Sequence, residues 1–580
     1  MTIRQRGGAS SSAIDVGQFR GASPVRVSER SRVASNVDLF RFPPGPDGAE
    51  EWMGAPMGSG APTNVITRLK GRTPTHDKML DSRPTERDEL LDWADRYARA
   101  LGSALAQHDV VVHGVRVRAL TNSSHLSSFF RVNWFTPEEW RERTGQVPPS
   151  QPQLLAYALT AVPDRPASAY YSRARNTVLF FNTAYYGQLK SWVLGAVGRL
   201  LAEERGIHSV HGACVELGGD GILYVAPTGT GKSTSSYGLM DHPDARFHSD
   251  DWVYVRYAVP GPDGEPVAPT RLTIGDQIVA GAAAIAAMVE GRPLRGRFSG
   301  YRLSGEEIEG DLAELDFREP PAAYAYTSEK VFYLRTNLVE SFPLAAAALL
   351  RSPTENVPSV SAELVDQRRA SLQAAAEAVA GGAAGVTPAV LEELARLVAF
   401  DNARAMLDAE HVFGRDRVVW NPMEPTRLRT VFLLQRDDTQ RQVLTPLTED
   451  QFLGTLLQGV TPTGTEETAY NAYRAVDDAA ERRAITTLFG QDAPSGLYRR
   501  ILAASDAPAT LRDEATLFRA MQHACRTYLL NTILLRDPAV DSRAEAVALT
   551  LRLIAAAARG NIRQPLSLDD YRRTLTERAP

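Results

Sequence analysis

The stretch Ile222–Thr234 reads ILYVAPTGTGKST: an apolar run, a turn with two glycines, a lysine and two hydroxyl side chains. The apolar run is typical of a buried strand, and the residues after it suit a turn and a helix start. In that order, the backbone around Gly229 and Gly231 can turn with its N–H groups pointing inward, beside the positive end of the helix. Such a cradle binds phosphate groups, so the stretch predicts a nucleoside triphosphate site.

Side chains next to this turn supply the remaining phosphate and metal contacts. We expect Lys232 to reach the β- and γ-phosphates and Ser233 to bind Mg²⁺ through its hydroxyl. Asp250 and Asp251 follow Lys232 by 18 and 19 residues and offer the hard oxygen ligands that this ion prefers. Ala226 stands where the usual pattern has its first glycine. The predicted nucleotide-binding residues are Thr228, Gly229, Thr230, Gly231, Lys232, Ser233 and Thr234.

The composition argues against several classes of protein. The chain has 580 residues, a net charge of −5 and 43% hydrophobic residues, enough for two to four domains with buried cores. The charges form no basic block, so nucleic acid is not an expected partner. No apolar leader and no run of roughly 18 to 20 apolar residues occurs, so we expect neither export nor membrane insertion. Only Cys214 and Cys525 occur, which favours a reducing, cytoplasmic location.

Hydrophobic periodicity divides the chain into helices and strands. Residues 1–60 are rich in Gly, Ser, Arg and Pro, and we expect a disordered arm there. A capping box at Ser542–Glu545 opens a helix that stops at Gly560. Further helices are predicted over 83–101 and 189–204, and an Ala-rich pair of helices over 361–400. Strands are predicted over 110–112, 115–117, 431–434 and 443–447. After 447 we expect mostly helices.

Polar motifs ahead of the phosphate turn carry a family resemblance. They are Gly71-Arg72-Thr73-Pro74 with Asp77-Lys78, Tyr185-Tyr186-Gly187-Gln188-Leu189-Lys190, and His208-Ser209-Val210-His211-Gly212. They are followed by the phosphate-binding turn at 226–234, which is called a P-loop, and by the Asp250-Asp251 turn. In this order, the five motifs resemble those of ATP-dependent phosphoenolpyruvate carboxykinase. Weaker matches extend the resemblance from about residue 65 to about 555: Phe332–Leu338, Glu355–Val357, Asn402–Arg404, Leu447–Gln451 and Tyr528–Thr532.

The resemblance implies a fold and a reaction. The fold is α/β and phosphoenolpyruvate carboxykinase-like, with an N-terminal substrate-side domain over 61–207 and a C-terminal P-loop nucleotide-binding domain over 208–580. Insertions are expected at 257–328 and, as helices, at 360–400. In the family's reaction, oxaloacetate and ATP give phosphoenolpyruvate, CO₂ and ADP, because loss of CO₂ produces an enolate that takes the γ-phosphate.

The resemblance also implies site residues. Arg72 would bind the substrate carboxylate, and Arg335 and Arg404 would neutralise charge on the transferring phosphoryl group. His211 is similar to the family histidine that binds Mn²⁺, an ion that accepts imidazole nitrogen. The expected catalytic residues are Arg72, Lys190, His211, Lys232, Asp250, Arg335 and Arg404, and the expected ligands of Mg²⁺ or Mn²⁺ are His211, Ser233, Asp250 and Asp251.

Departures from the family pattern leave the acceptor open. Ser191 stands where the family has a second lysine, Glu467 where it has an arginine, and Arg335 where it has a lysine. An alternative is a repurposed kinase that phosphorylates another small molecule or a protein hydroxyl, like HPr kinase/phosphorylase, which has a related His-Gly and Asp-Asp. A third class, a nucleotide-binding regulatory protein with little turnover, is disfavoured by His211 and the three arginines. The sequence decides neither ATP against GTP nor the oligomeric state.

Overall fold

The fold is that of a computed structural model. It describes residues 66–67, 80–160, 162–166, 168–182, 186–226, 230, 232–240, 242–290, 294–330, 332–335, 404–407, 409, 413–437, 439–459, 461, 479–489, 495–532, 543–560 and 562–571. The expected arm over 1–60 and the expected helical pair over 361–400 lie outside these residues. Among the helices of the described ranges, none is both long and apolar enough to cross a membrane.

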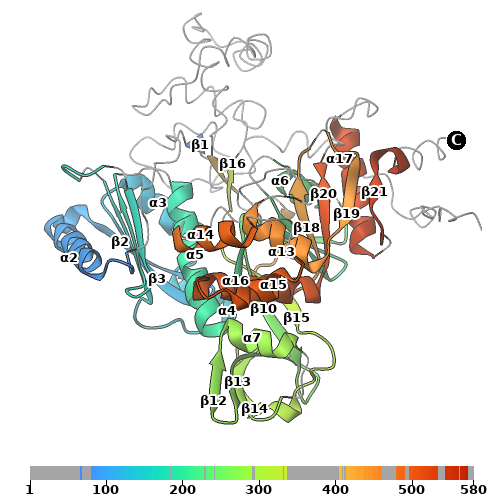
Figure 1. Cartoon of the computed structure of the whole chain (residues 1–580). Helices are drawn as coiled ribbons and strands as arrows, with labels where there is room; N and C mark the ends of the chain where they lie inside the picture. Colours follow the sequence, from blue (N-terminus) through green and yellow to red (C-terminus); the bar gives the residue numbers. More distant parts are fainter. Residues whose placement is uncertain are drawn as a thin grey trace, which may run out of the picture.

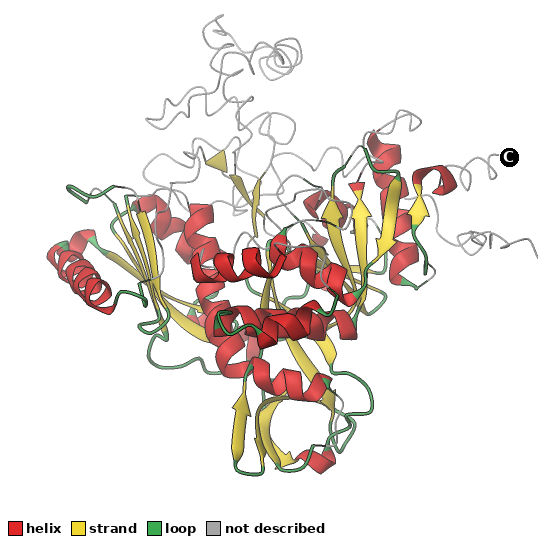
Figure 2. Cartoon of the chain, in the orientation of Figure 1, coloured by secondary structure: helices red, strands yellow, loops and turns green. Residues whose placement is uncertain are grey.

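A five-stranded sheet forms the first layer of the molecule (Figure 1). The expected strands at 110–112 and 115–117 are confirmed as parts of a hairpin, whose turn at His113 and Gly114 has φ of 46° and 79°. Helix α2 packs on one face of the sheet, and α3 and α5 pack on the other (Figures 1 and 2). In spatial order the strands are β2 (Ala106–Val112), β3 (Val115–Thr121), β4 (Leu154–Leu159), β6 (Thr177–Phe181) and β5 (Ser168–Ser172), and the helices are α2 (Pro84–Ala100), α3 (Ser124–Asn133) and α4 (Pro137–Thr144).

Helix α5 (Tyr186–Arg205) lies between this sheet and a second, larger one. The predicted helix over 189–204 is confirmed, but the single apolar face expected for it is wrong. Nearly every residue up to Leu201 is buried, since one side of α5 packs on the first sheet and the other side contacts Trp252 and Tyr254 of the second. Lys190 is consequently enclosed, with no exposed surface. A charge in that position needs partners inside the protein.

The larger sheet has a parallel centre. Strand β8 (Asp220–Val225), β18 (Thr426–Gln435) and β20 (Arg526–Asn531) run parallel, and β7 (His208–Leu217) pairs with β8 in the antiparallel sense. Helices α7, α13, α15 and α16 cover one face. On the other face, rings of the three parallel strands stack on one another, and α6 and α17 pack there.

The remaining elements complete this sheet and its cover. The predicted strands at 431–434 and 443–447 are confirmed within β18 and β19, and the helix expected to stop at Gly560 is confirmed as α17. The mostly helical remainder after 447 is confirmed in the described residues by α13 to α17. Strand β20 was not predicted, because a short apolar run does not by itself distinguish a strand from a helix. The bounds are β19 (Gln442–Pro446), β21 (Leu566–Ser567), α6 (Lys232–Leu239), α13 (Glu449–Gln458), α14 (Ala479–Phe489), α15 (Leu497–Ala503), α16 (Ala509–Ala524) and α17 (Arg543–Ala558).

Residues 257–328, where the sequence predicts an insertion, include a lobe of antiparallel strands, drawn at the bottom of Figure 1. Its ends belong to the larger sheet, because β10 continues to Pro260 and β15 begins at Ala322. A separate three-stranded sheet joins β1, β17 and β16. The bounds are β9 (Ala245–Ser249), β10 (Trp252–Pro260), β11 (Pro266–Ile274), β12 (Gln277–Ala280), α7 (Ala282–Val289), β13 (Arg297–Arg302), β14 (Glu307–Asp311), β15 (Ala322–Thr327), β1 (Ile66–Thr67), β16 (Phe332–Arg335) and β17 (Arg404–Leu407).

Gly281 joins this lobe to α5, and we expect its replacement by alanine to destabilise the fold. Its φ of 56° suits glycine, and a Cβ there would collide with the backbone oxygen of Glu203 in α5. We expect Gly281→Ala to lower the free energy of unfolding by about 3 kcal/mol or more. Gly275 is the matched control, because it also has a positive φ (60°) but open space around it, and Gly275→Ala should cost about 1 kcal/mol. Equal losses in urea unfolding would contradict this close contact.

Candidate functional site

The carboxyl ends of the parallel strands gather at one edge of the larger sheet. Strand β8 ends at Val225, and α6 begins at Lys232. The hydroxyl of Thr532, just past β20, donates to the backbone oxygens of Thr230 (3.0 Å) and Gln435 (3.2 Å). One side chain thus links the loop after β8 to the ends of β18 and β20. In open α/β sheets, ligands bind at this edge.

Only part of the predicted nucleotide loop belongs to the described residues. The backbone of Thr230 and of the start of α6 is placed there. Thr228, Gly229 and Gly231 lie outside the described residues, and so do the side chains of Ser233 and Thr234. Their contact with phosphate stays a prediction.

Strand pairing places the Asp250-Asp251 turn beside His211. Strands β9 and β10 both pair with β7, so that Ser249 faces Cys214 and Trp252 faces His211. The two aspartates form the corner between β9 and β10. The N–H of Gly212 donates to the backbone oxygen of Asp251 at 2.9 Å, and Asp251 has a φ of 83°, a strained conformation for a residue with a side chain.

The Asp251 carboxylate is the centre of an ion cluster. Its Oδ1 lies 3.0 Å from His211 Nε2 and 3.4 Å from Lys232 Nζ, and its Oδ2 contacts Lys190 Nζ. Asp250 Oδ1 lies 3.2 Å from Lys232 Nζ and accepts a hydrogen bond from the Asp251 N–H. Five residues predicted for the site therefore lie together.

A buried chain of polar groups continues from Lys190. Its Nζ lies 3.1 Å from Glu329 Oε1, which accepts a hydrogen bond from Asn133 Nδ2 at 2.8 Å. The Tyr186 hydroxyl in turn donates to Asn133 Oδ1 at 2.7 Å. Sequence reasoning missed Glu329 and Asn133 and gave Tyr186 no role in the site. The one available signal was an isolated glutamate two residues after the end of the apolar strand β15.

Burial and neighbouring charges shift the pKa values in this cluster. Burial alone would raise the pKa of Asp251, but Lys190, Lys232 and the His211 hydrogen bond hold it well below its usual range. The pKa values of both lysines are raised, since attraction to the carboxylates outweighs burial. Burial lowers the pKa of His211, so its ring is neutral near pH 7. Burial also raises the pKa of Glu329 to about 7, against the attraction of Lys190.

The predicted arginines are placed only in part. Arg335 and Arg404 face each other as neighbours on β16 and β17 of the three-stranded sheet. Their side chains lie outside the described residues, and Arg72 lies outside them altogether. Contact of these arginines with a substrate stays a prediction.

The predicted metal ligands come together only partly. Within the described ranges, no group of three or more His, Cys, Asp and Glu side chains is arranged to hold a metal ion. Asp250 Oδ1 contacts Lys232 and a backbone N–H, whereas His211 Nε2 and Asp251 Oδ1 lie 3.0 Å apart. The last two atoms fit as two ligands of one ion whose other ligands are water or phosphate, and the imidazole nitrogen suits Mn²⁺ better than Mg²⁺, which prefers oxygen ligands.

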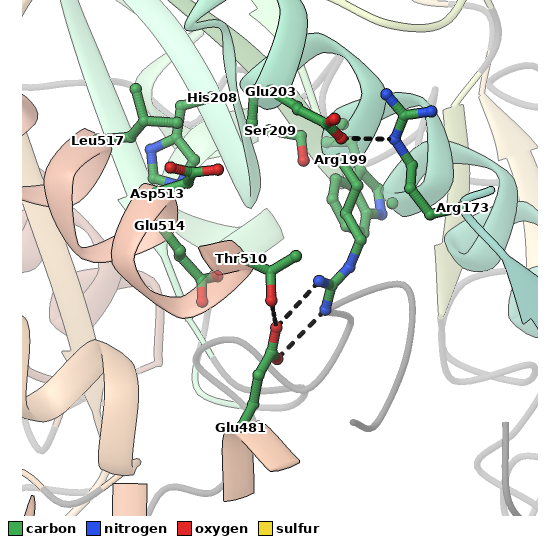
Figure 3. A pocket seen from close by; sticks show the side chains of 14 residues that line it. Arg173, Arg199, Glu203, His208, Ser209, Glu481, Thr510, Asp513, Glu514 and Leu517 are labelled. Atoms are coloured by element: carbon green, nitrogen blue, oxygen red, sulfur yellow. Dashed lines mark hydrogen bonds and ion pairs between the residues drawn. The ribbon is translucent and has the colours of Figure 1, made fainter. Parts of the chain in front are cut away.

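A cavity of about 70 Å³ lies on another side of α5, between α5, α16 and β7 (Figure 3). Its ion pairs are internal: Arg199 binds Glu481 at 3.0 and 3.2 Å, and Arg173 binds Glu203 at 2.8 Å. Thr510 also donates to Glu481. Ligand pockets usually measure about 300 to 1,000 Å³, so this cavity is too small for a nucleotide. Its ion pairs fix α5, and with it Lys190, against α14 and α16.

Comparison with known proteins gives one relative. The chain is 27% identical over 206 residues to "Phosphoenolpyruvate carboxykinase (ATP)" from Zea mays, which is 34% of this chain and 28% of that protein. The match thus spans little more than a quarter of the relative's length. No protein-family model matches the chain. These findings support a distant similarity to an ATP-dependent enzyme.

Removal of the Asp251 charge is expected to destabilise the fold more than removal of the Asp250 charge. Asparagine keeps the shape of aspartate and tolerates positive φ, so Asp251→Asn tests the charge alone. Two buried ammonium groups would lose a partner, and we expect the free energy of unfolding to fall by about 3 to 5 kcal/mol. Asp250→Asn is the matched control and should cost less, because Lys232 keeps Asp251. Urea unfolding of both variants measures the difference, and equal losses would argue against Asp251 as the centre.

Glu329 is expected to make stability depend on pH. Its folded pKa of about 7 lies above the ordinary 4.5, so the folded protein holds this proton more tightly than the unfolded chain. That contribution to stability is complete below about pH 4.5 and is lost as the pH rises through about 7. Wild type should therefore lose stability relative to Glu329→Gln across this window. Melting temperatures of both proteins from about pH 4.5 to about pH 8 test this, and a constant difference would refute it.

Proposed function

We propose that the chain is an ATP-dependent phosphotransferase that resembles phosphoenolpyruvate carboxykinase. The observation that carries the proposal is the position of Lys232, which begins α6 directly after the loop of β8 and contacts both aspartates of the next turn. A lysine and a helix start at the end of a parallel strand suit the terminal phosphates of a nucleotide. The similarity to an enzyme named for ATP supports the same assignment.

In this proposal, ATP binding rearranges the ion cluster. Lys232 exchanges part of its contact with Asp250 and Asp251 for the β- and γ-phosphates. His211 and Asp251, with the hydroxyl of Ser233, would hold Mg²⁺ or Mn²⁺, which neutralises phosphate charge. Lys190 keeps Asp251 ionised and in place, because it contacts both Asp251 and Glu329. Charged groups that are already fixed in this way do not have to reorganise when charge moves in the transition state.

Oxaloacetate is the first candidate acceptor. Loss of CO₂ leaves an enolate oxygen with a full negative charge, which takes the γ-phosphoryl group and gives phosphoenolpyruvate and ADP. No proton has to be removed from the acceptor in this reaction. Arg72 would bind its carboxylate, and Arg335 and Arg404, neighbours across β16 and β17, would lie along the phosphoryl group.

A repurposed kinase is the second candidate, and Ser191 favours it. This residue is 4% exposed, and its hydroxyl donates to the Gly187 backbone oxygen at 2.8 Å within α5. It is thus engaged in the helix and cannot replace the second lysine of the carboxykinase pattern. A small molecule or a protein that offers a hydroxyl must lose a proton when it is phosphorylated. His211, kept neutral by burial, is the base candidate for that step, and in this second candidate it acts as the base in place of its role as a metal ligand.

Phosphorus NMR with ATP tests the proposal and separates the two acceptors. Wild type with Mg²⁺ and Mn²⁺ should convert ATP to ADP when the acceptor is present, and Lys232→Ala should lose this turnover by about a hundredfold or more, because the terminal phosphates lose their lysine. Arg441→Ala is a control, since Arg441 pairs with the remote Asp569. Wild-type turnover in Lys232→Ala would end the proposal.

The acceptor is decided by the product. Phosphoenolpyruvate formed from oxaloacetate and ATP excludes the repurposed kinase. Its absence with both metals present, while ATP still binds, excludes the carboxykinase reaction. A panel of hydroxyl-bearing acceptors then follows.

A further inference from the structure

Arg256 on β10 is a buried cation without a carboxylate partner in the described part of the chain. Its side chain and backbone together are 6% exposed. Its Nε donates to His113 Nε2 at 3.2 Å, and its guanidinium lies 5.0 Å from the centre of the Tyr326 ring. That bond to His113 is the one hydrogen bond that the guanidinium makes to described residues. The two Nη groups therefore have donors to offer.

His113 accepts the hydrogen bond that orients Arg256, and its own ring N–H is a donor without an acceptor in the described residues. It lies in the β2–β3 turn, is 1% exposed, and stacks on the Tyr254 ring at 4.9 Å. Burial, Arg256 and Arg205 hold its pKa well below the usual range, so the ring is neutral. Because Nε2 accepts from Arg256, the hydrogen of the neutral ring sits on Nδ1. Nδ1 is buried and has no hydrogen-bond partner in the described residues.

Arg205, at the end of α5, adds a second cation to this group. It lies near enough to lower the pKa of both Arg256 and His113, and its own guanidinium is 5.8 Å from the centre of the Tyr301 ring. The other groups that act on Arg256 are Tyr326 and Tyr301, and no carboxylate is among them. Arg256 thus lies within the electrostatic influence of Arg205 and has no carboxylate among the described residues, and the Nδ1–H on the other edge of the His113 ring is left without an acceptor there.

Such a cluster is costly unless an anion completes it. A buried charge without a counter-charge costs several kcal/mol, and a planar guanidinium binds carboxylate or phosphate oxygens in pairs. We propose that Arg256, held by His113 and with the charge of Arg205 nearby, forms a binding site for a small oxyanion at the junction of the two sheets. Its ligand is inorganic phosphate or a small carboxylate.

This oxyanion site is distinct from the proposed nucleotide site. Arg256 follows Asp251 by five residues on the extended β10, which places it on the order of 16 Å away. The three residues come from the first sheet, from α5 and from the second sheet. A bound anion therefore joins the three elements that also position Lys190 and Asp251. The proposal does not depend on the function proposed above.

Thermal unfolding in the Lys232→Ala background tests the oxyanion site, because that variant removes the proposed phosphate contact elsewhere. Inorganic phosphate should raise its Tm by a few degrees over chloride at equal ionic strength. Adding Arg256→Met should abolish the rise in Tm. Arg165→Met is the matched control and should leave the rise unchanged. Arg165 also lies over an aromatic ring, 4.2 Å from the centre of Trp93, but on the far side of the first sheet. Malonate in place of phosphate tells a carboxylate ligand from a phosphate ligand.

Two results would overturn the proposal: the absence of any oxyanion-specific rise, and an equal rise with and without Arg256. If Arg256→Met does not fold, crystals of the unmodified protein soaked in selenate test the oxyanion site. We expect an anomalous peak within hydrogen-bond distance of the Arg256 Nη atoms. The absence of a peak at that position refutes the site.

Discussion

The ion pair between Lys190 and Asp251 is the constraint on which the rest of the site depends. Lys190 is enclosed on a helix between two sheets, and Asp251 lies in a corner with a φ of 83°. Each charge stabilises the other, because a buried charge that loses a partner costs several kcal/mol. The pair therefore fixes the rotation of α5 and the shape of the corner together. His211 and Lys232 then take their positions on the remaining oxygen of Asp251.

Glu329 and Asn133 extend this constraint into the first sheet. Glu329 shares Lys190 with Asp251, and Asn133 at the end of α3 donates to it. Full satisfaction of a buried polar network gives a unique arrangement, whereas partial satisfaction is costly. The same network suits either acceptor, since it fixes positive charge beside the place where a phosphoryl group would transfer. The difference between the two candidate reactions lies in Ser191 and in how the acceptor is bound.

Local patterns predicted much of the chain that touches the site. The apolar run before Ala226 and the helical spacing over 189–204 correspond to β8 and α5, because each pattern depends on neighbours within one element. The grouping of Lys190, His211, Lys232, Asp250 and Asp251 in the structure agrees with the set expected from the order of motifs. Strand β20 was not predicted, because its apolar run forms a strand by pairing with β18, which lies about a hundred residues earlier in the chain.

The sequence by itself determined the strand that ends at Val225, the helix that begins at Lys232 and the acidic pair that follows, because these features depend on residue order and backbone preference. Only the tertiary structure decided that α5 is buried on both sides, that Glu329 becomes a partner of Lys190 and Asn133 a partner of Glu329, and that Arg256 has no carboxylate beside it among the described residues. Each of these depends on which elements pack against each other. The cost of a buried charge is set by all its neighbours in space, and a sequence read along the chain does not contain them.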